Sequence, residues 1–532
     1  MQGYVYFNNM RGLFIVIVVA LIAIRYLFVS GFLPTHDGEY HIIRMYEFGR
    51  MLADGHIIPR WAPGLNSGYG VPLFIFFYPL PNYIGSLFHF FGWSLADSFR
   101  LTMAVGYMVA VVSCYVWLKR LYGIFPATVG SIVGAFVPYW SVDIFVRGSV
   151  GEVLALGFVF LALASISYER GILLAFAVAG LISSHNIMAM VFMPVVVLYA
   201  WIADRSMARY LLAGVLLASY FWIPALMERG AVIGLNVVNY TDHFPDLAQL
   251  FIPSWGTGFS GPGYEADEVS FQVGIIPTAM IFFGTAVFWH KKTFPELLFF
   301  AISVVALLLM QEISITVWET IAFLKNLQYP WRLLSVIVVS IPLIVAAVTS
   351  RIGRPMVSAG IAIVAILFSF SYTKPVLYEP RSDAYYISRR EFTDGTSSLG
   401  NSFSTAWMSW QKERPAQRME MVNGEGIITM KKEEMTTFLG EITTRTGGSV
   451  RTNVAYYPGW RINVDGIESQ AKPDEKGAIS AVIGPGTHTV AVYFSRTPLR
   501  LAADLISLVG LAVLAWWGIL HVLKSVVHTD HL

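Results

Sequence analysis

Twelve apolar segments recur along this chain of 532 residues and constrain its fold more than any other feature. A helix needs about 20 apolar residues to cross the hydrocarbon core of a bilayer. Segments that meet or approach this length lie at 12–33, 100–118, 124–140, 150–167, 171–184, 187–203, 208–226, 271–289, 295–311, 331–350, 355–373 and 501–523. We therefore expect a polytopic α-helical membrane protein with about twelve transmembrane helices.

The composition agrees with this expectation and excludes several classes of protein. Hydrophobic residues make up 56% of the chain and charged residues only 13%, against about 25% in a soluble domain. The mean hydropathy of +0.60 excludes a soluble globular protein or a disordered one. A formal net charge of +2 and a single cysteine exclude a dedicated nucleic-acid-binding protein and a disulfide-stapled scaffold.

A thirteenth apolar stretch, 72–92, is ambiguous, and the flanking basic residues decide how it is placed. Lys and Arg are enriched in cytoplasmic loops. If 72–92 does not cross, the basic residues that flank the spans all fall on one face; if it crosses, the pattern breaks at Lys119. Three prolines within or at the edge of 72–92 also disturb the regular helix that a lipid-exposed span needs. We therefore expect 72–92 to be a re-entrant or surface-lying segment on the outer side, with both termini cytoplasmic.

Charged residues concentrate in one part of the chain. Residues 374–499 hold 29 of the 70 Asp, Glu, Lys and Arg residues. Strand-like alternation and Gly and Pro turn signals predict a β-sandwich from about 425, reached through an irregular segment that lines the membrane domain. We thus expect a transmembrane domain at 1–373 with a first outer loop at 34–99, an extracytoplasmic domain at 374–499, and a final span with a cytoplasmic tail at 500–532.

Ionisable residues gather directly after the first span. His36, Asp37, Glu39 and His41 lie within six residues, and Arg44 follows. In a helix that starts near Asp37, the side chains of Asp37, His41 and Arg44 would share one face. One interpretation is a helix in the headgroup layer, capped by Asp37, whose charges are merely solvated. The other is a partly desolvated carboxylate that acts as a general base beside a lipid phosphate.

Further polar residues at the predicted outer ends of spans are candidates for the same site. Arginine suits a bidentate grip on phosphate, although arginine in the headgroup layer is also ordinary. An ion pair or a turn residue is the alternative explanation for the rest. These candidates are Arg60, Arg147, Glu152, His185, Asn186 and Arg332.

Sequence motifs for nucleotide binding and for hydrolysis are absent. The chain has no Walker A loop, dinucleotide glycine fingerprint, nucleophile elbow or H-E-x-x-H motif. Any sugar or phosphate donor must then arrive already activated, most naturally on a lipid.

The order of these features resembles the GT-C glycosyltransferases. Phe91-Gly-Trp-Ser94 with Arg100 resembles a stretch of the aminoarabinose transferases and protein mannosyltransferases. The run from His36 through Arg60-Trp61, with Arg147-Gly148, His185-Asn186 and Tyr329-Pro-Trp-Arg332, is similar to the prokaryotic membrane proteins labelled "6-pyruvoyl-tetrahydropterin synthase-related". Tyr456-Tyr-Pro-Gly-Trp460 is similar to the β-domain of that family and of the YfhO-type proteins.

The resemblance implies an inverting glycosyltransferase in the cytoplasmic (inner) membrane of a prokaryote, with its active site and β-domain on the outer face. A polyprenyl-phosphate sugar would be the donor, and a lipid, glycan or protein the acceptor. Asp37 would be the base and Glu39 a second candidate, although Gly38 separates the two acids where the mannosyltransferases have them adjacent. No cofactor is required, but a divalent metal at Asp37 and His41 stays open. The alternatives are a non-catalytic accessory or assembly protein for surface polysaccharide or glycolipid, and a flippase for lipid-linked oligosaccharides.

Overall fold

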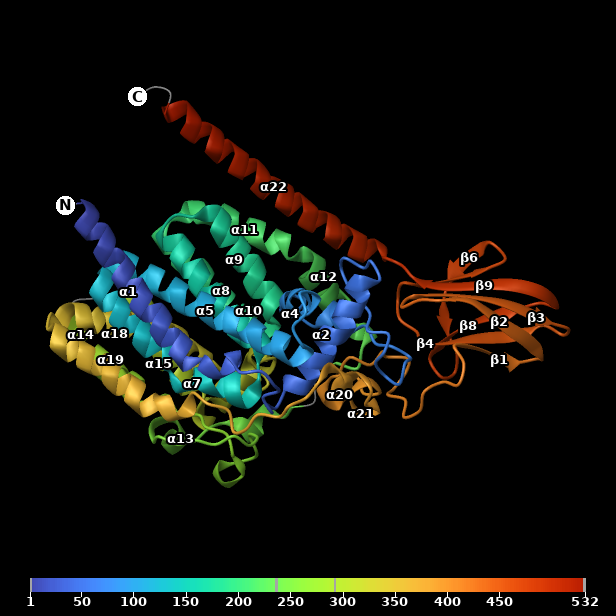
Figure 1. Cartoon of the computed structure of the whole chain (residues 1–532), viewed down its shortest axis with the longest axis horizontal. Helices are drawn as coiled ribbons and strands as arrows, with labels where there is room; N and C mark the ends of the chain where they lie inside the picture. Colours follow the sequence, from blue (N-terminus) through green and yellow to red (C-terminus); the bar gives the residue numbers. More distant parts are fainter. Residues whose placement is uncertain (1, 235–237, 291–292, 530–532) are drawn as a thin grey trace.

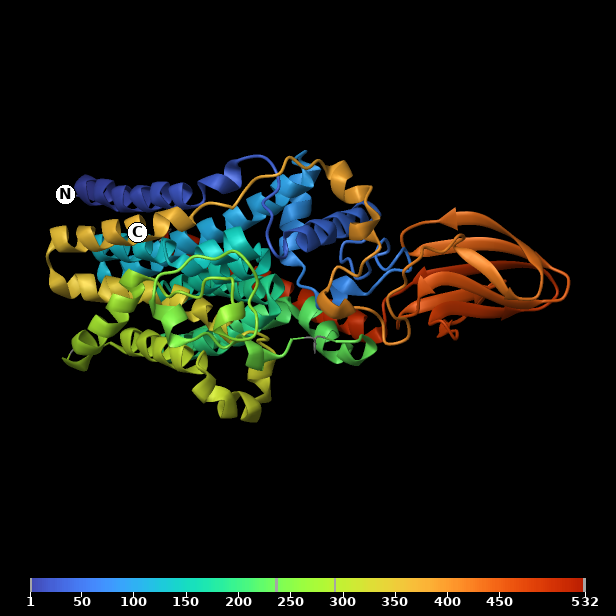
Figure 2. The same ribbon diagram turned by 90° about the horizontal axis from the view of Figure 1, so that it is seen from below.

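The computed structural model describes residues 2–234, 238–290 and 293–529 of the chain. A helical bundle carries a β-sandwich at one end, and the last helix runs back along the bundle (Figure 1). In both views the first helix begins and the last helix ends far from the sandwich (Figure 2). A polytopic helical protein with a β-rich domain before its last helix is therefore confirmed.

The first part of the bundle extends to residue 227. Its helices are α1 (Gln2–Ala23), η1 (Arg25–Phe28), α2 (Gly38–Ala53), α3 (Leu73–Phe76), α4 (Leu80–Phe90), α5 (Leu95–Tyr122), α6 (Ile124–Ala135), α7 (Pro138–Ser141), η2 (Val142–Arg147), α8 (Val150–Ser167), α9 (Gly171–Ser184), α10 (Asn186–Ala203), η3 (Arg205–Met207), α11 (Ala208–Leu217) and α12 (Ser219–Met227).

The second part contains shorter helices in the loops and the remaining apolar helices. They are η4 (Arg229–Ala231), η5 (Tyr240–His243), α13 (Leu247–Phe251), η6 (Tyr264–Ala266), α14 (Ile275–His290), α15 (Phe294–Leu309), η7 (Glu312–Ser314), α16 (Ile315–Thr320), α17 (Ala322–Lys325), η8 (Pro330–Leu333), α18 (Leu334–Ile352), α19 (Pro355–Ser369), η9 (Phe370–Tyr372), α20 (Asp383–Ile387), α21 (Arg390–Thr393), η10 (Leu399–Asn401) and α22 (Pro498–Thr529).

Each predicted span contains an apolar helix, but the helices differ in length. Among the described residues, six helices are long and apolar enough to cross a membrane, and three bent pairs bring the number to nine if each pair counts as one span. Shorter apolar helices occupy three further predicted spans, at Met10–Ala23, Gly171–Ser184 and Ile275–Thr285. The total of twelve crossings stays a prediction.

The bundle has a buried centre and a lipid-facing rim. The most apolar stretch of η8–α18 is 94% buried within the protein, whereas that of α22 is only 28% buried. Helix α18 is buried on all sides from Leu334 to Thr349, as expected for a largely apolar helix enclosed by others. The ambiguous stretch 72–92 forms α3 and α4, which begin after Pro72 and Pro79. With 11 residues, α4 is about 16 Å long and too short to cross, and it packs against α2 and α5.

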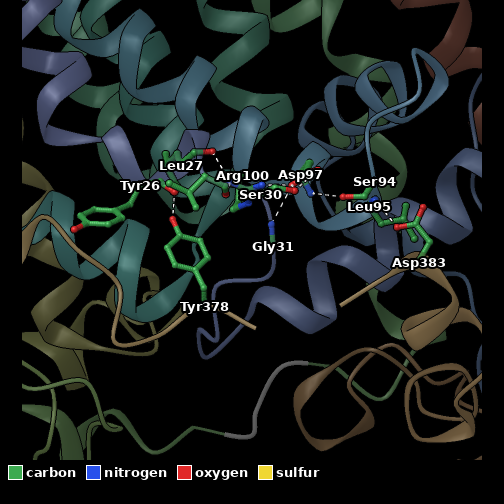
Figure 3. A network of polar contacts seen from close by, with 11 residues as sticks. Tyr26, Leu27, Ser30, Gly31, Ser94, Leu95, Asp97, Arg100, Tyr378 and Asp383 are labelled. Atoms are coloured by element: carbon green, nitrogen blue, oxygen red, sulfur yellow. Dashed lines mark hydrogen bonds and ion pairs between the residues drawn. The ribbon is translucent and has the colours of Figure 1, made fainter. Parts of the chain in front are cut away.

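A polar network fixes the chain that leaves the first span (Figure 3). Ser94 caps α5, and the buried Arg100 donates to the carbonyl oxygens of Leu27, at 2.7 Å, and Val29 and pairs with Asp97. Asp97 in turn accepts from Ser30 and from the backbone N–H of Gly31. The Ser94–Arg100 motif therefore anchors the segment that leads to Asp37 and does not itself contribute to a site.

Two sheets form the β-rich domain. One has the strand order β1-β4-β8-β7 and the other β2-β3-β9-β5-β6, with antiparallel pairing throughout. Alternate residues of β3 are buried, which is the pattern of a strand with one face on a core. The strands are β1 (Met419–Asn423), β2 (Gly426–Glu433), β3 (Thr437–Thr444), β4 (Gly448–Ala455), β5 (Trp460–Val464), β6 (Ile467–Gln470), β7 (Lys472–Pro473), β8 (Ala478–Ile483) and β9 (Gly486–Phe494). The first strand begins slightly before the predicted start at about 425.

A buried ion pair joins the β-rich domain, α22 and the end of α12. Arg500 is fully buried and donates two hydrogen bonds to Glu228, at 2.9 and 2.8 Å. The Tyr457 hydroxyl donates to the same carboxylate at 2.7 Å. Three segments that are distant in the sequence therefore depend on one acid.

We predict that Glu228→Ala destabilises the protein by about 3–5 kcal/mol, because Arg500 would be left buried and unpaired. The melting temperature of the detergent-solubilised protein should fall clearly. The exposed Glu319→Ala is the control and should change it little. Equal melting temperatures for the two variants would contradict this role of Glu228.

Candidate active site

Backbone pairing holds Asp37 at the outer end of the bundle. The N–H of His36 donates to the carbonyl of Val146 at 3.0 Å, and the N–H of Asp37 donates to that of Arg147 at 2.9 Å. Gly148 follows with φ +67°, and a Cβ there would lie 2.2 Å from Thr35 Oγ1. Only glycine allows the two segments to approach this closely. The first outer loop is thus fixed to the bend between η2 and α8.

Asp37 occupies the N-cap position of α2, as predicted, but its side chain does not cap the helix. The carboxylate accepts no hydrogen bond from the first turn of α2. Within the described part of the chain, it also forms no ion pair or other side-chain hydrogen bond. The residue is half-buried. The interpretation of Asp37 as an ordinary capping residue is therefore wrong, and its carboxylate oxygens stay available to a ligand.

A buried cluster of ion pairs lies next to Asp37. The Arg147 guanidinium pairs with Asp143 and with Glu152, the latter at 2.9 Å, and donates to the Tyr139 hydroxyl at 3.0 Å. Its carbon Cζ lies 4.9 Å from the centre of the Trp331 ring. Arg147, Asp143 and Glu152 are all at most 4% exposed. The ion pair predicted as an alternative for Arg147 and Glu152 is present, with Asp143 as a third member.

His41 and Arg44 lie on the buried face of α2, as the spacing predicts. The His41 ring stacks on Phe99, with ring centres 5.9 Å apart, and burial holds its pKa well below the usual 6.5. Arg44 donates to Ser397 and lies 4.0 Å over the Phe77 ring. Burial lowers the pKa of Arg44, and the neighbouring Tyr78 and Asp37 oppose that effect.

Tyr78 connects these residues to the rest of the cluster. Burial raises its pKa, and the charges of Arg44, Asp37, Arg332 and Glu152 all act on it. The ring of His185 packs on Tyr78, with centres 4.9 Å apart. The structure thus brings together seven of the predicted residues, six of them around the Tyr78 ring and Arg147 through its ion pair with Glu152. These are Asp37, His41, Arg44, Arg147, Glu152, His185 and Arg332.

Arg332 retains unused hydrogen-bonding capacity. Its Nη1 donates to the Leu327 carbonyl and to Gln328 Oε1, both at 2.8 Å. Its Nε and the indole N–H of the adjacent Trp331 are both buried, and neither has a hydrogen-bond partner among the described residues. A buried donor without a partner costs about 1–3 kcal/mol, so these two N–H groups favour a bound acceptor.

Three other predicted residues lie differently. Asn186 donates to the Phe76 carbonyl at 3.1 Å and so fixes α3, although its Oδ1 has no partner within the described ranges. Glu39 is ion-paired with Arg381, which leaves Asp37 as the free acid of the two. His36 stacks on Phe259 at 4.3 Å, with its Nε2 3.0 Å from the Thr257 carbonyl oxygen, and burial lowers its pKa.

The prediction that Arg60 grips phosphate is wrong. Arg60 donates to Asp504 of α22 at 2.6 Å and to the Tyr220 carbonyl at 3.1 Å. It is only 7% exposed, and α22 already neutralises its charge. Arg60 fastens the first outer loop to the last helix.

A cavity of about 520 Å³, here called the first cavity, opens next to Asp37. Its wall includes His36 and Glu39, which flank Asp37, although Asp37 itself does not line it. The opposite wall comes from the segment after α19, as predicted for the irregular stretch. The lining residues used below are His36, Glu39, Tyr40, Ile43, Thr396 and Trp410.

Sequence reasoning missed Asp143, Tyr139 and Ser397. Asp143 is a single acid in an apolar stretch, and this isolation could have identified it from the sequence. Nothing in the sequence around Ser397 identifies it, because its contact with Arg44 joins residues that are 353 positions apart.

The described residues contain no group of three or more His, Cys, Asp and Glu side chains that could hold a metal ion. His41 is enclosed by aromatic rings. A metal at Asp37 and His41 stays a prediction.

Comparison with known proteins yields distant similarities. No protein-family model matches the chain. An uncharacterised protein of Lactococcus lactis subsp. cremoris (strain MG1363) is 24% identical over 208 residues, a match that covers 36% of this chain and 33% of that protein. The matched part thus spans about a third of the relative's length, and the predicted family name stays a prediction.

Among solved structures, the chain is similar to the arabinofuranosyltransferase AftD from Mycobacteria, with 17% identity, a TM-score of 0.44, and coverage of 70% of this chain and 27% of that one. It is similar to ArnT from Cupriavidus metallidurans bound to undecaprenyl phosphate, with 14% identity, a TM-score of 0.40, and coverage of 69% and 63%. The oligosaccharyltransferase of Archaeoglobus fulgidus gives 12% identity, a TM-score of 0.40, and coverage of 75% and 57%. Function must be inferred from the site itself, since all three TM-scores are below 0.5.

We predict that the protein loses stability as pH falls below about 6.5, in part through His41. Its pKa is 6.5 when unfolded and lower when folded, so the unfolded state gains the proton first. His41→Gln should reduce the drop in melting temperature between pH 7.5 and pH 5.5. The exposed His89→Gln is the control, and an equal drop in both variants would contradict the prediction.

Proposed function

We propose that this chain is an integral-membrane glycosyltransferase of the GT-C type. It would transfer a sugar, with inversion, from a polyprenyl-phosphate donor to an acceptor on the outer face of a prokaryotic inner membrane. The observation that carries the proposal is the unpaired carboxylate of Asp37, which the fold holds directly against a buried cluster of arginines. Structural acids in such apolar surroundings are normally paired, as Asp143 and Glu152 are here.

The residues of the cluster divide into two chemical roles. Asp37 would take the proton from the acceptor hydroxyl as that oxygen attacks the anomeric carbon of the sugar. The bond between the anomeric carbon and the phosphate oxygen then breaks, and the lipid phosphate leaves with the electron pair. Arg332, with its free Nε, and Arg147 would stabilise the negative charge on that phosphate.

The surroundings of Asp37 suit a base that acts on a neutral hydroxyl. Its backbone is fixed through Arg147, so the carboxylate is held in place before the acceptor binds. No donor from the described part of the chain occupies its lone pairs, and the first cavity gives an acceptor a route to its neighbours His36 and Glu39. Glu39 would position the acceptor or Arg381, because its own carboxylate is already paired.

Asp37→Asn should reduce sugar transfer by about a hundredfold or more, the usual effect of removing a general base. The assay uses membrane vesicles that contain the full chain and a panel of radiolabelled polyprenyl-phosphate sugars, and it measures label that leaves the donor fraction. Asp242→Asn, an exposed acid of the loop after α12, is the matched control. Near-normal transfer by a folded Asp37→Asn protein would refute the assignment and favour an accessory role.

Arg332→Gln should weaken the binding of undecaprenyl phosphate by about tenfold to a hundredfold, because a charge-assisted contact to phosphate is lost. Binding is measured on the purified protein by titration with the lipid in detergent. Arg354→Gln is the control, since Arg354 lies exposed just beyond the opposite end of α18. Unchanged affinity in Arg332→Gln would remove Arg332 from the phosphate site.

A further inference from the structure

A second cavity lies farther along helix α2, between the membrane domain and the β-sandwich. Its volume is about 510 Å³, similar to the volume of the first cavity. Both volumes lie within the range of about 300–1,000 Å³ that is typical of ligand sites. Its wall combines aromatic rings with charged side chains. The lining residues used here are Tyr46, Arg50, Trp61, Tyr69, Arg414 and Phe438.

Both cavities use the same face of α2. Tyr40 and Ile43 of α2 line the first cavity, and Tyr46 and Arg50 of the same helix line the second. Steps of three and four residues place side chains on one side of a helix. The 16 residues of α2 span about 24 Å, so the two cavities follow one another along its length.

One segment forms the opposite wall of both cavities. Thr396 and Trp410 line the first cavity, and Thr393 and Arg414 line the second. This segment is attached to α2 by the hydrogen bond from Arg44 to Ser397, 3.1 Å long. The two cavities are therefore hollows between the same two walls, with Asp37 beside one end and the β-sandwich at the other.

From this arrangement we infer that the two cavities bind a linear glycan chain whose growing end is presented to Asp37. The inference rests on the proposed function and specifies its acceptor as an oligosaccharide or polysaccharide. A single sugar would fill one cavity and leave the second without a purpose.

The lining of the second cavity favours an uncharged, hydroxyl-rich occupant. Its three arginines are already paired within the protein, since Arg50 contacts Glu47 at 2.8 Å, Arg418 contacts Glu433 at 3.0 Å, and Arg414 contacts Asp394. A charged ligand would have to break these pairs, and a lipid chain would bury them. The half-buried rings of Tyr69 and Tyr46 offer flat apolar area, and the paired groups keep donors and acceptors for hydroxyls.

The test measures binding of neutral linear oligosaccharides of one to eight units, in several sugar series, to the full chain in detergent. No donor is supplied, so the result does not depend on transfer. We expect affinity to rise with length in at least one series. Tyr69→Ala should weaken the longer chains about tenfold and leave the monosaccharide and disaccharide unchanged, whereas Trp410→Ala should weaken every length.

Trp407→Ala is the matched control, because Trp407 and Trp410 are both 40% exposed and, of the two, only Trp410 lines either of the cavities described above. It should leave binding unchanged. Failure of every series to bind, equal affinity at all lengths, normal binding by Tyr69→Ala, or selective binding of unstructured peptides would each overturn the inference. The proposed function fails separately, if Asp37→Asn keeps its transfer activity.

Discussion

The site depends on Arg147, which makes contacts through both its side chain and its backbone carbonyl. Its guanidinium is enclosed by Asp143, Glu152 and Tyr139 and lies over Trp331, so it joins the bend before α8 to the start of α18. Its carbonyl accepts the N–H of Asp37. A buried arginine that is paired and stacked has little freedom to move. Its rigidity therefore passes to the backbone of Asp37.

This geometry explains how an acid can stand among arginines without pairing with one. The arginines nearest to Asp37 spend their hydrogen bonds elsewhere: Arg147 on Asp143 and Glu152, and Arg44 on Ser397. Their positive charge still acts at Asp37, but none of the residues that the structure describes donates to its oxygens. The fold thus keeps a carboxylate open at the point where a hydroxyl would arrive.

Local patterns were sufficient to predict most of the architecture. All twelve apolar segments contain helices, and α2 begins next to Asp37 and Glu39. The helices within 72–92 are too short to cross a membrane. Periodicity and proline placement act within a few residues, so a single sequence displays them. The convergence of Arg147, His185 and Arg332 was also anticipated, because polar residues at the same ends of spans meet when the spans pack.

The partners of individual charges could not be predicted, because they come from remote segments. Arg60 was expected at the phosphate and instead pairs with Asp504, which lies 444 residues later in the sequence. Glu39 pairs with Arg381, which belongs to the segment after α19. Taken alone, the side chains of Arg60 and Glu39 do not differ from those of catalytic residues, so the sequence cannot tell the two roles apart.

These remote pairs have a common consequence for the site. Arg60 fastens the first outer loop to α22, and Glu39 and Arg44 fasten α2 to the segment after α19. The attachments of Glu39 and Arg44 hold the two walls of the cavities together. The segment after α19 continues into the β-sandwich, and residues of β2, β3 and β4 line the far end of the second cavity. The acids and arginines that do no chemistry thereby define the space in which Asp37 can act.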